Sequence, residues 1–130
     1  MNKLILVVVG GGIGSGARYL VALGSIRLFG PEFPWGTFAV NVLGSFLLGL
    51  ILGWIASHPQ HGEIVRLAFG TGVMGGFTTY SSFNAETLRM IESGTYGLAA
   101  GYAGMTFVVC LVAGTAGLWL ESKARKNGSG

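Results

Sequence analysis

A short run of hydroxyl and aromatic side chains interrupts an otherwise apolar part of the chain. Residues 75–86 have the sequence Gly-Gly-Phe-Thr-Thr-Tyr-Ser-Ser-Phe-Asn-Ala-Glu. In hydrocarbon every backbone amide and side-chain hydroxyl needs a hydrogen-bond partner. Such a run is therefore stable at membrane depth only where it is buried in protein or lines a path filled with water or ions. The run indicates conduction or transport.

Other polar side chains are scattered through the apolar stretches around this run. They are Arg18, Thr37, Asn41, Asn84, Tyr102 and Thr106. Each of them costs free energy in hydrocarbon, which favours a functional or at least a partnered role. The alternative for any one Ser or Thr is a hydrogen bond to a carbonyl of its own helix. That alternative explains the group less well, because the four hydroxyls at 78–82 and Glu86 fall within about two helical turns.

Gly75 and Gly76 come directly before the hydroxyls and predict the position of a helix break, because glycine weakens a helix and favours kinks. A break leaves carbonyl oxygens free at the end of the first half and amide groups free at the start of the second. The carbonyls can hold a cation and the amides an anion.

Composition places these residues in a membrane protein. Of the 130 residues, 51% are hydrophobic and only 10% are charged, whereas an ordinary soluble domain has roughly 25% charged residues. Residues 33–57, 67–85 and 93–120 are uncharged, and residues 4–29 are apolar apart from two arginines. Each stretch is near or above the roughly 18 to 20 residues that a spanning helix needs. We expect an all-α membrane protein with four transmembrane helices, the third broken. A single domain would cover residues 1–126, and residues 127–130 form a tail that could be artificial.

Four other interpretations conflict with this pattern. Residues 4–17 resemble a strand followed by a dinucleotide-binding glycine motif, but the long uncharged helices leave no room for a parallel sheet. The serines at 81–82 have no histidine at membrane depth to activate them, since both histidines lie in the polar link 57–63. The lone Cys110 offers neither a disulfide nor a thiolate metal site. The basic residues near the C-terminus, which account for much of the pI of 9.4, favour a cytoplasmic end over nucleic-acid binding.

The charged residues give little information about orientation. With four spans, Lys3 and Arg66 share one side with the basic C-terminal tail, whereas Arg27 and Arg89 share the other. The two sides of the membrane therefore carry equal numbers of these basic residues once the C-terminal tail is left out. A chain with little lysine and arginine bias can insert in both orientations, which an antiparallel, dual-topology homodimer requires. A fixed orientation with the basic C-terminus inside the cell is the alternative.

Glycines recur at four-residue spacing, which lets membrane helices approach closely. The pairs are Gly10 and Gly14, Gly12 and Gly16, Gly49 and Gly53, and Gly97 and Gly101. For most of these glycines we expect close packing to be the whole role.

Three motifs follow one another along the chain. The first span contains Gly14-x-x-x-Arg18, the second contains Trp35-Gly36-Thr37-x-x-Val40-Asn41, and the third contains Gly75-Gly76-Phe77-Thr78-Thr79-Tyr80-Ser81-Ser82-Phe83. The last motif resembles the Gly-Gly-x-Thr-Thr-Phe-Ser-Thr-Phe signature of the Fluc (CrcB) fluoride channels, and size, span number and motif order agree over essentially the whole chain. The resemblance implies a channel, not an enzyme, that exports fluoride passively across the bacterial inner membrane as a multi-pass protein in lipid. It also implies an antiparallel homodimer with two fluoride pathways and a structural sodium ion at the dimer interface.

The resemblance also assigns roles to individual side chains. Phe83 and Tyr80 would present the electropositive edges of their rings to the anion. Asn41 would donate its side-chain amide to fluoride, in place of lost water. The remaining side chains would line the pathway or its ends: Thr37, Ser81, Ser82, Glu86, Tyr102 and, toward a vestibule, Arg18.

The sodium ion implied by the resemblance would be held by the backbone carbonyls of Gly75 and Thr78 from both subunits. Two positions depart from the family pattern. Tyr80 stands where relatives commonly have Phe, so a hydroxyl is added that could donate to fluoride or anchor the ring. Cys110 stands where relatives carry Ser, and we leave it out of the site.

Two other functions account for part of the sequence. A small dual-topology, proton-coupled multidrug transporter would use Glu86 as its exchanging carboxylate, but it would need that carboxylate in an early span beside an aromatic cavity. A scaffold protein that does not conduct would explain the glycines but not the buried hydroxyls. We therefore expect a fluoride channel.

Overall fold

Every regular element in residues 2–128, the residues that the computed structural model describes, is a helix. In chain order these are α1 (Lys3–Phe29), α2 (Trp35–Ser57), α3 (Gly62–Val65), a π-helical segment η1 (Arg66–Met74), α4 (Gly75–Phe77), α5 (Tyr80–Glu92) and α6 (Tyr96–Gly128). The first and last two residues of the chain, Met1 with Ser129 and Gly130, lie outside this description. Residues 127 and 128, which were assigned to a tail from the sequence, therefore continue α6.

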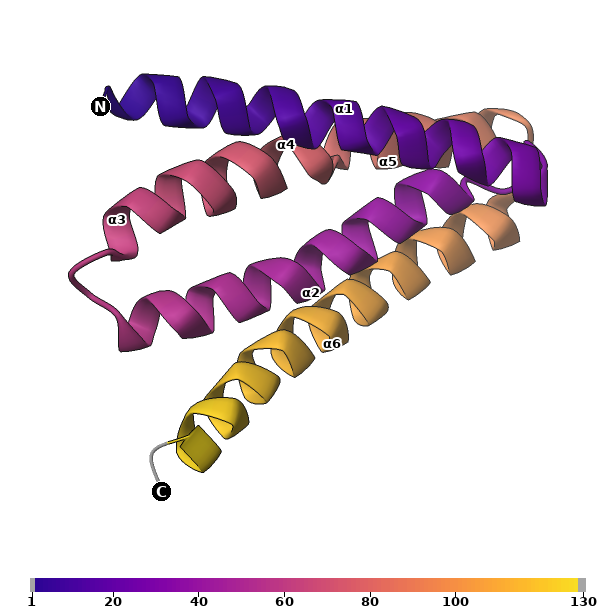
Figure 1. The fold of residues 1–130 in the computed structure, drawn as a ribbon. Helices are drawn as coiled ribbons and strands as arrows, with labels where there is room; N and C mark the ends of the chain where they lie inside the picture. Colours follow the sequence, from indigo (N-terminus) through magenta and orange to yellow (C-terminus); the bar gives the residue numbers. More distant parts are fainter. Residues whose placement is uncertain (1, 129–130) are drawn as a thin grey trace.

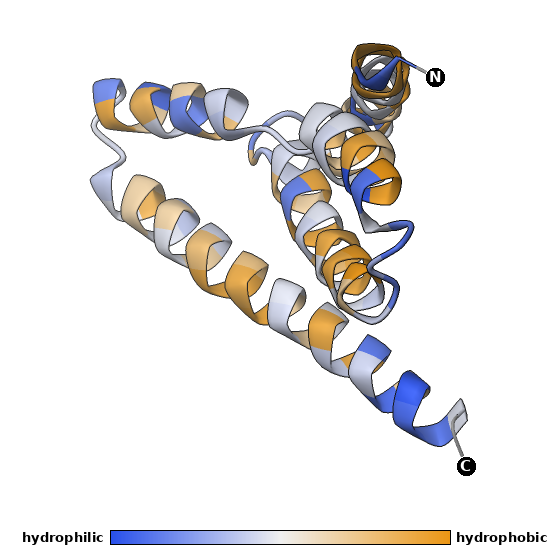
Figure 2. Ribbon diagram, turned by 90° about the vertical axis from the view of Figure 1, so that its left-hand side faces the viewer, coloured by the Kyte–Doolittle hydropathy of each residue, from blue (hydrophilic) through white to orange (hydrophobic). Residues whose placement is uncertain are grey.

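Three of these helices are long and apolar enough to cross a membrane, namely α1, α2 and α6. Figure 2 shows apolar residues along most of α6 and hydrophilic residues gathered at its C-terminal end. The expectation of an all-helical protein with membrane-spanning helices is confirmed to this extent. The third expected span, residues 67–85, is divided among η1, α4 and α5 and is not one continuous helix.

The helices run back and forth in one bundle. In Figure 1, α1 and the segment from α3 to α5 run in one direction, whereas α2 and α6 run in the other. The most extensive contact joins α2 to α6, and α1 packs mainly on η1 and α4. Consequently α2 lies beside α6 on one flank and near the interrupted segment on the other.

Glycines make the closest of these contacts, because a side chain there would collide with a neighbouring backbone. A Cβ atom at Gly14 of α1 would overlap the carbonyl oxygen of Val73, and one at Gly49 of α2 would overlap that of Gly114 in α6. A Cβ at Gly53 would come within 2.8 Å of Glu121 Oε2. The packing role predicted for these glycines is thus borne out.

Other glycine pairs make no close contact within the described chain. A Cβ atom at any member of the pairs Gly12–Gly16 and Gly97–Gly101 would have no neighbour within 4 Å. The four-residue spacing alone therefore does not identify which glycines pack.

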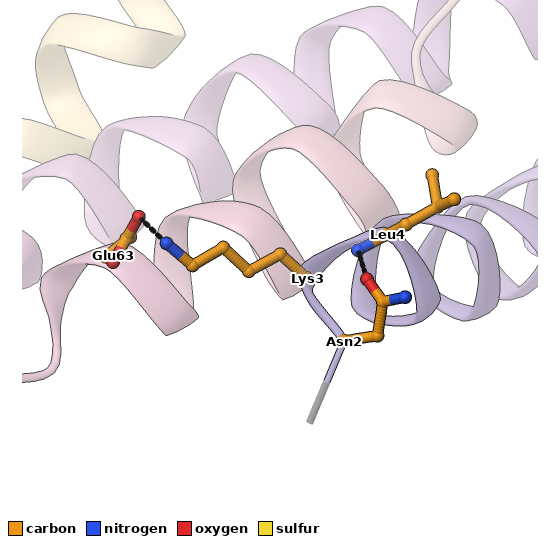
Figure 3. Close-up of polar contacts among 4 residues, drawn as sticks. All are labelled: Asn2, Lys3, Leu4 and Glu63. Atoms are coloured by element: carbon orange, nitrogen blue, oxygen red, sulfur yellow. Dashed lines mark hydrogen bonds and ion pairs between the residues drawn. The ribbon is translucent and has the colours of Figure 1, made fainter.

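The N-terminal end of α1 contacts α3, the short helix between α2 and η1, through an ion pair. The Asn2 side chain caps α1 by accepting a hydrogen bond from the Leu4 amide at 3.0 Å. Lys3 Nζ lies 2.6 Å from Glu63 Oε1 (Figure 3). The hydrogen bond and the charge of Lys3 lower the pKa of the Glu63 carboxyl below its usual value. Because both side chains are largely exposed, the pair contributes little to stability.

The third apolar stretch is interrupted after the glycine pair, not at it. Gly75 and Gly76 are helical, α4 ends at Phe77, Thr78 is extended with φ −79° and ψ 158°, and α5 begins at Tyr80. The position expected for the break was therefore wrong by two residues. The physical reason is that Gly76 is needed for packing, since a Cβ there would overlap the carbonyl oxygen of Gly11.

Candidate functional site

Asn41 of α2 closes the gap between α4 and α5. Its Nδ2 donates to the carbonyl oxygen of Thr79 at 3.0 Å, and its Oδ1 accepts from the Thr79 amide at 2.8 Å. The carboxamide thus completes the hydrogen bonds of an extended residue, as a neighbouring strand would. A side-chain amide has a second N–H, and among residues 2–128 no acceptor takes it. Asn41 can therefore hold the break and still offer one donor to the adjoining cavity.

Thr79 starts α5 as its N-cap. Its Oγ1 accepts from the Ser82 amide at 3.1 Å and lies within 3.3 Å of the hydroxyls of Ser81 and Ser82. Thr78, in contrast, donates its hydroxyl to the carbonyl of Met74 at 2.9 Å. The alternative of a bond to the helix's own backbone is therefore correct for Thr78, whereas Ser81 and Ser82 belong to the first turn of α5.

The same hydrogen bonds leave two carbonyl oxygens without their regular helical donors. The Thr79 amide, which would bond to Gly75 in a continuous helix, donates to Asn41 instead. The Ser82 amide, which would bond to Thr78, donates to the Thr79 hydroxyl. Gly75 and Thr78, the residues whose carbonyls were expected to hold sodium, both line the cavity described below.

Carbonyl oxygens suit a hard cation such as sodium. Within residues 2–128 there is no group of three or more His, Cys, Asp or Glu side chains that could hold a metal ion. A cation at this position would therefore be held by backbone carbonyl oxygens, with the Thr78 and Thr79 hydroxyls nearby.

Glu86 joins three helices. Its Oε1 accepts from the Thr37 hydroxyl of α2 at 2.7 Å, and its Oε2 accepts from the Tyr102 hydroxyl of α6 at 2.8 Å. Both carboxylate oxygens of this α5 residue are thus engaged. The structure brings together these three residues, which the sequence assigned to one pathway.

Aromatic rings form a row beside this hydrogen-bonded group. The ring centre of Phe83 lies 5.8 Å from Tyr80 and 5.3 Å from Tyr102. Phe33, from the connection before α2, packs edge-on against Tyr102 at 5.4 Å. Tyr102 is only 1% exposed, whereas Tyr80 is 76% exposed. The row therefore leads from an open end at Tyr80 to a buried end at Tyr102.

A cavity of about 720 Å³ lies between α2, the interruption and α6. Its polar lining includes the side chains of Asn41, Thr79 and Thr106, and its aromatic lining includes Tyr80 and Phe83. No charged side chain of the described chain lines it. The cavity therefore combines a few hydrogen-bonding groups and two aromatic rings with an uncharged, mainly apolar lining, which suits a small ion that has lost its water.

Thr106 is a polar residue within a span, and no role was predicted for it from the sequence. Thr106 is 7% exposed, and its Oγ1 has no hydrogen-bond partner among the described residues. Its position one helical turn after Tyr102 places it on the same face of the helix, and this spacing could have indicated Thr106 as a site residue. Phe33 was missed because its contact with Tyr102 joins segments far apart in the chain.

Arg18 is the one expected site residue that the structure does not bring to the others. It is half-buried on α1 and lines neither of the two cavities described in this chain. Its expected place at a vestibule remains a prediction.

Apolar helices of spanning length, with an uncharged and mainly apolar cavity that carries a few polar groups, define a small helical membrane protein. Residues 5–118 match the family described as CrcB-like protein, Camphor Resistance (CrcB). The chain is 47% identical to the "Fluoride-specific ion channel FluC" of Caulobacter vibrioides (strain NA1000 / CB15N), over 95% of this chain and 98% of the relative. It is 53% identical to the protein of the same name from Anaeromyxobacter sp. (strain K), over 87% of this chain and 90% of the relative. The chain belongs to the CrcB family.

Proposed function

We propose that this chain forms a fluoride-selective channel that lets fluoride leave a bacterial cell passively across the inner membrane. The relatives are bacterial proteins named fluoride-specific ion channels. The observation that carries the proposal is the uncharged cavity that combines a free amide N–H of Asn41 with the rings of Tyr80 and Phe83. The relatives' name gives no support to the alternative, a multidrug transporter.

The mechanism is stepwise replacement of water. Fluoride is a small, strong hydrogen-bond acceptor, so it enters the protein only where donors compensate for lost hydration. The second N–H of Asn41 supplies one donor, and the ring edges of Phe83 and Tyr80 supply positive potential without attracting a cation. Beyond Phe83, the hydroxyls that bond to Glu86 continue the polar path toward the end of the bundle. The hydroxyls of Thr37 and Tyr102 offset the charge of Glu86, which lowers its repulsion of an anion.

The complete channel would be an antiparallel, dual-topology homodimer in which each subunit crosses the membrane four times. The third crossing would consist of η1, α4 and α5, broken at Thr78 and Thr79. Support for four crossings comes from the alternating direction of α1, α2, the α3–α5 segment and α6 (Figure 1). The second subunit would cover large apolar side chains of α6 beside the cavity, where Phe107 is 71% exposed and Leu111 is 63% exposed.

The centre of this dimer would hold one structural sodium ion. The carbonyls of Gly75 and Thr78 lose their helical donors to Asn41 and Thr79, and two such pairs could surround a cation between subunits. Replacing sodium with a larger monovalent cation should lower the dimer's melting temperature. Anomalous scattering should place one cation on the two-fold axis, and a map without density there would remove this part of the proposal.

The function is tested by ion efflux from proteoliposomes that contain the purified chain. Fluoride should leave rapidly once the membrane potential is dissipated, whereas chloride loaded under the same conditions should stay. Chloride release at the same rate, or fluoride release no faster than from empty liposomes, would contradict the proposal.

A further inference from the structure

A second cavity, of about 620 Å³, lies at one end of the bundle. It is enclosed by residues 30–34, which connect α1 to α2, by the C-terminal half of α5 and by the start of α6. Neither the family nor the fluoride path derived above assigns a role to the charged residues Glu32 and Arg89, which line it.

This cavity lies beside the hydrogen-bonded group of the candidate pathway. Thr37 and Glu86 line it, and they are hydrogen-bonded to each other at 2.7 Å. Glu86 also accepts from Tyr102, whose ring lies 5.3 Å from Phe83 in the first cavity. An ion that reaches the Tyr102 end of the aromatic row is therefore next to the second cavity.

The two cavities differ in charge. The first has no charged lining, whereas the second is lined by Glu32, Glu86 and Arg89. Glu86 accepts two hydrogen bonds, but the side chains of Glu32 and Arg89 are exposed and make no ion pair or hydrogen bond with any residue from 2 to 128. Their fields therefore act on a passing anion separately, with opposite signs.

We propose that this second cavity is a capture vestibule for small inorganic anions, in which Arg89 raises and Glu32 lowers the local anion concentration. The proposal rests on the fluoride channel function proposed above. Without Arg89 the lining would carry only carboxylates, and an anion would be repelled at the point where it enters. Charges at the mouth of a narrow path change association rates in this way.

A purely structural role for Arg89 makes a different prediction. Arg89 lies in the last turn of α5, where a basic side chain stabilises the helix end. Its loss would then lower the melting temperature and would affect flux equally at all salt concentrations. A capture role acts through space and is screened by salt.

The experiment compares initial fluoride efflux rates in neutral-lipid proteoliposomes, with fluoride held below saturation. The variants are Arg89→Gln, Arg89→Lys, Glu32→Gln and Arg27→Gln. Arg27 lies in the last turn of α1 at the same end of the bundle but does not line the cavity, so it controls for net charge. Rates are measured at about 0.01 M and about 1 M of a salt with a large impermeant anion, where the Debye length is about 30 Å and about 3 Å.

At low salt, Arg89→Gln should reduce the rate and Glu32→Gln should raise it, each by roughly threefold, as expected for one unit charge acting through water over roughly 6 Å. Arg89→Lys and Arg27→Gln should stay close to the parent, and all differences should shrink at high salt. Equal rates for the parent, Arg89→Gln and Glu32→Gln would overturn this inference alone. A reduced efflux rate in both Arg89→Gln and Glu32→Gln that persists at high salt would also overturn this inference. A parent that releases no fluoride would overturn the proposed function and this inference with it.

Discussion

Asn41 combines a structural and a functional role in one carboxamide. It exchanges two hydrogen bonds with the backbone of Thr79, and its second N–H is left for the cavity. The family resemblance implied the donor role of Asn41 but not its hydrogen bonds to the Thr79 backbone. An interruption shows in sequence as a polar run, but the partner that satisfies its backbone lies on another helix.

The first prediction concerns Asn41→Asp. The carboxylate can still accept from the Thr79 amide, but it leaves the Thr79 carbonyl without its donor and places a negative charge in an uncharged cavity. Fluoride efflux from proteoliposomes should fall to the level of empty liposomes. Asn84→Asp makes the same chemical change at an exposed site on α5 that lines neither cavity, and it should conduct normally. Near-normal efflux in Asn41→Asp, with folding intact, would contradict the role given to Asn41.

The second prediction separates the ring edge of Phe83 from its bulk. Phe83→Ile keeps an apolar side chain but removes the electropositive edge, so fluoride efflux should fall severely. The stability should change by less than about 1.5 kcal/mol, a usual limit for swaps that conserve volume. Efflux and thermal melting in detergent measure the two effects. Unchanged efflux would show that Phe83 serves packing only.

Tyr80→Phe is the matched comparison for this prediction. Tyr80 is 76% exposed and its hydroxyl makes no hydrogen bond with residues 2–128, so an edge-only role predicts efflux at least equal to that of the parent. A large loss of efflux would show that the Tyr80 hydroxyl contacts the ion or fixes the ring.

At the scale of elements, glycine determines which helices can touch. Gly14 of α1 meets the backbone at Val73, whereas Gly12, two residues earlier on the same helix, has open space beyond it. The four-residue spacing could not distinguish them, because the spacing repeats on both faces of the helix. Only the position of η1 and α4 decides which face is covered.

The third prediction uses this pair. Gly14→Ala forces a Cβ atom into the carbonyl of Val73 and must push α1 from η1, which should cost at least about 1 to 3 kcal/mol, as overpacking does. Gly12→Ala should leave melting unchanged or raise it, because alanine favours a helix by up to about 1 kcal/mol over glycine. Thermal melting of the two purified variants in detergent provides the comparison. Equal destabilisation by both substitutions would contradict the packing described for α1.

The position of the helix interruption shows a second limit of sequence at this scale. Glycines are the strongest local signal for a break, yet Gly75 and Gly76 are helical and the extended residue is Thr78. Tertiary contacts determine where the helix is interrupted: Gly76 packs on α1, Asn41 is hydrogen-bonded to Thr79, and Thr79 caps α5. Hydropathy predicted α1, α2 and α6 because the apolar residues that identify a long spanning helix are contiguous in the sequence.

At the scale of the whole molecule, the family resemblance assigned Thr37, Glu86 and Tyr102 to one pathway. These three residues meet in one hydrogen-bonded group. Phe33 and Thr106 carried no such motif and became visible only in three dimensions. Contacts between distant segments are set by helix packing, which residue types alone do not encode.

The fourth prediction concerns orientation in the membrane. Lysine and arginine residues are level between the two ends of the bundle once the C-terminal tail is left out, so nothing strong fixes one orientation. Both orientations should therefore coexist, as an antiparallel dimer requires. Pro31→Cys and Pro59→Cys, each made in a Cys110→Ser background, place a thiol before and after α2, at opposite ends of one span.

In spheroplasts, a maleimide that cannot cross the membrane should label each of these variants to about half the extent reached after permeabilisation, because half of the copies expose each end. A single orientation would give full labelling of one variant and none of the other, and would refute the antiparallel dimer while leaving the family assignment intact. Adding two lysines beside position 59 should bias the chain toward one orientation. If conduction needs antiparallel partners, fluoride efflux should fall with that bias, and co-expression with a variant biased the opposite way should restore it.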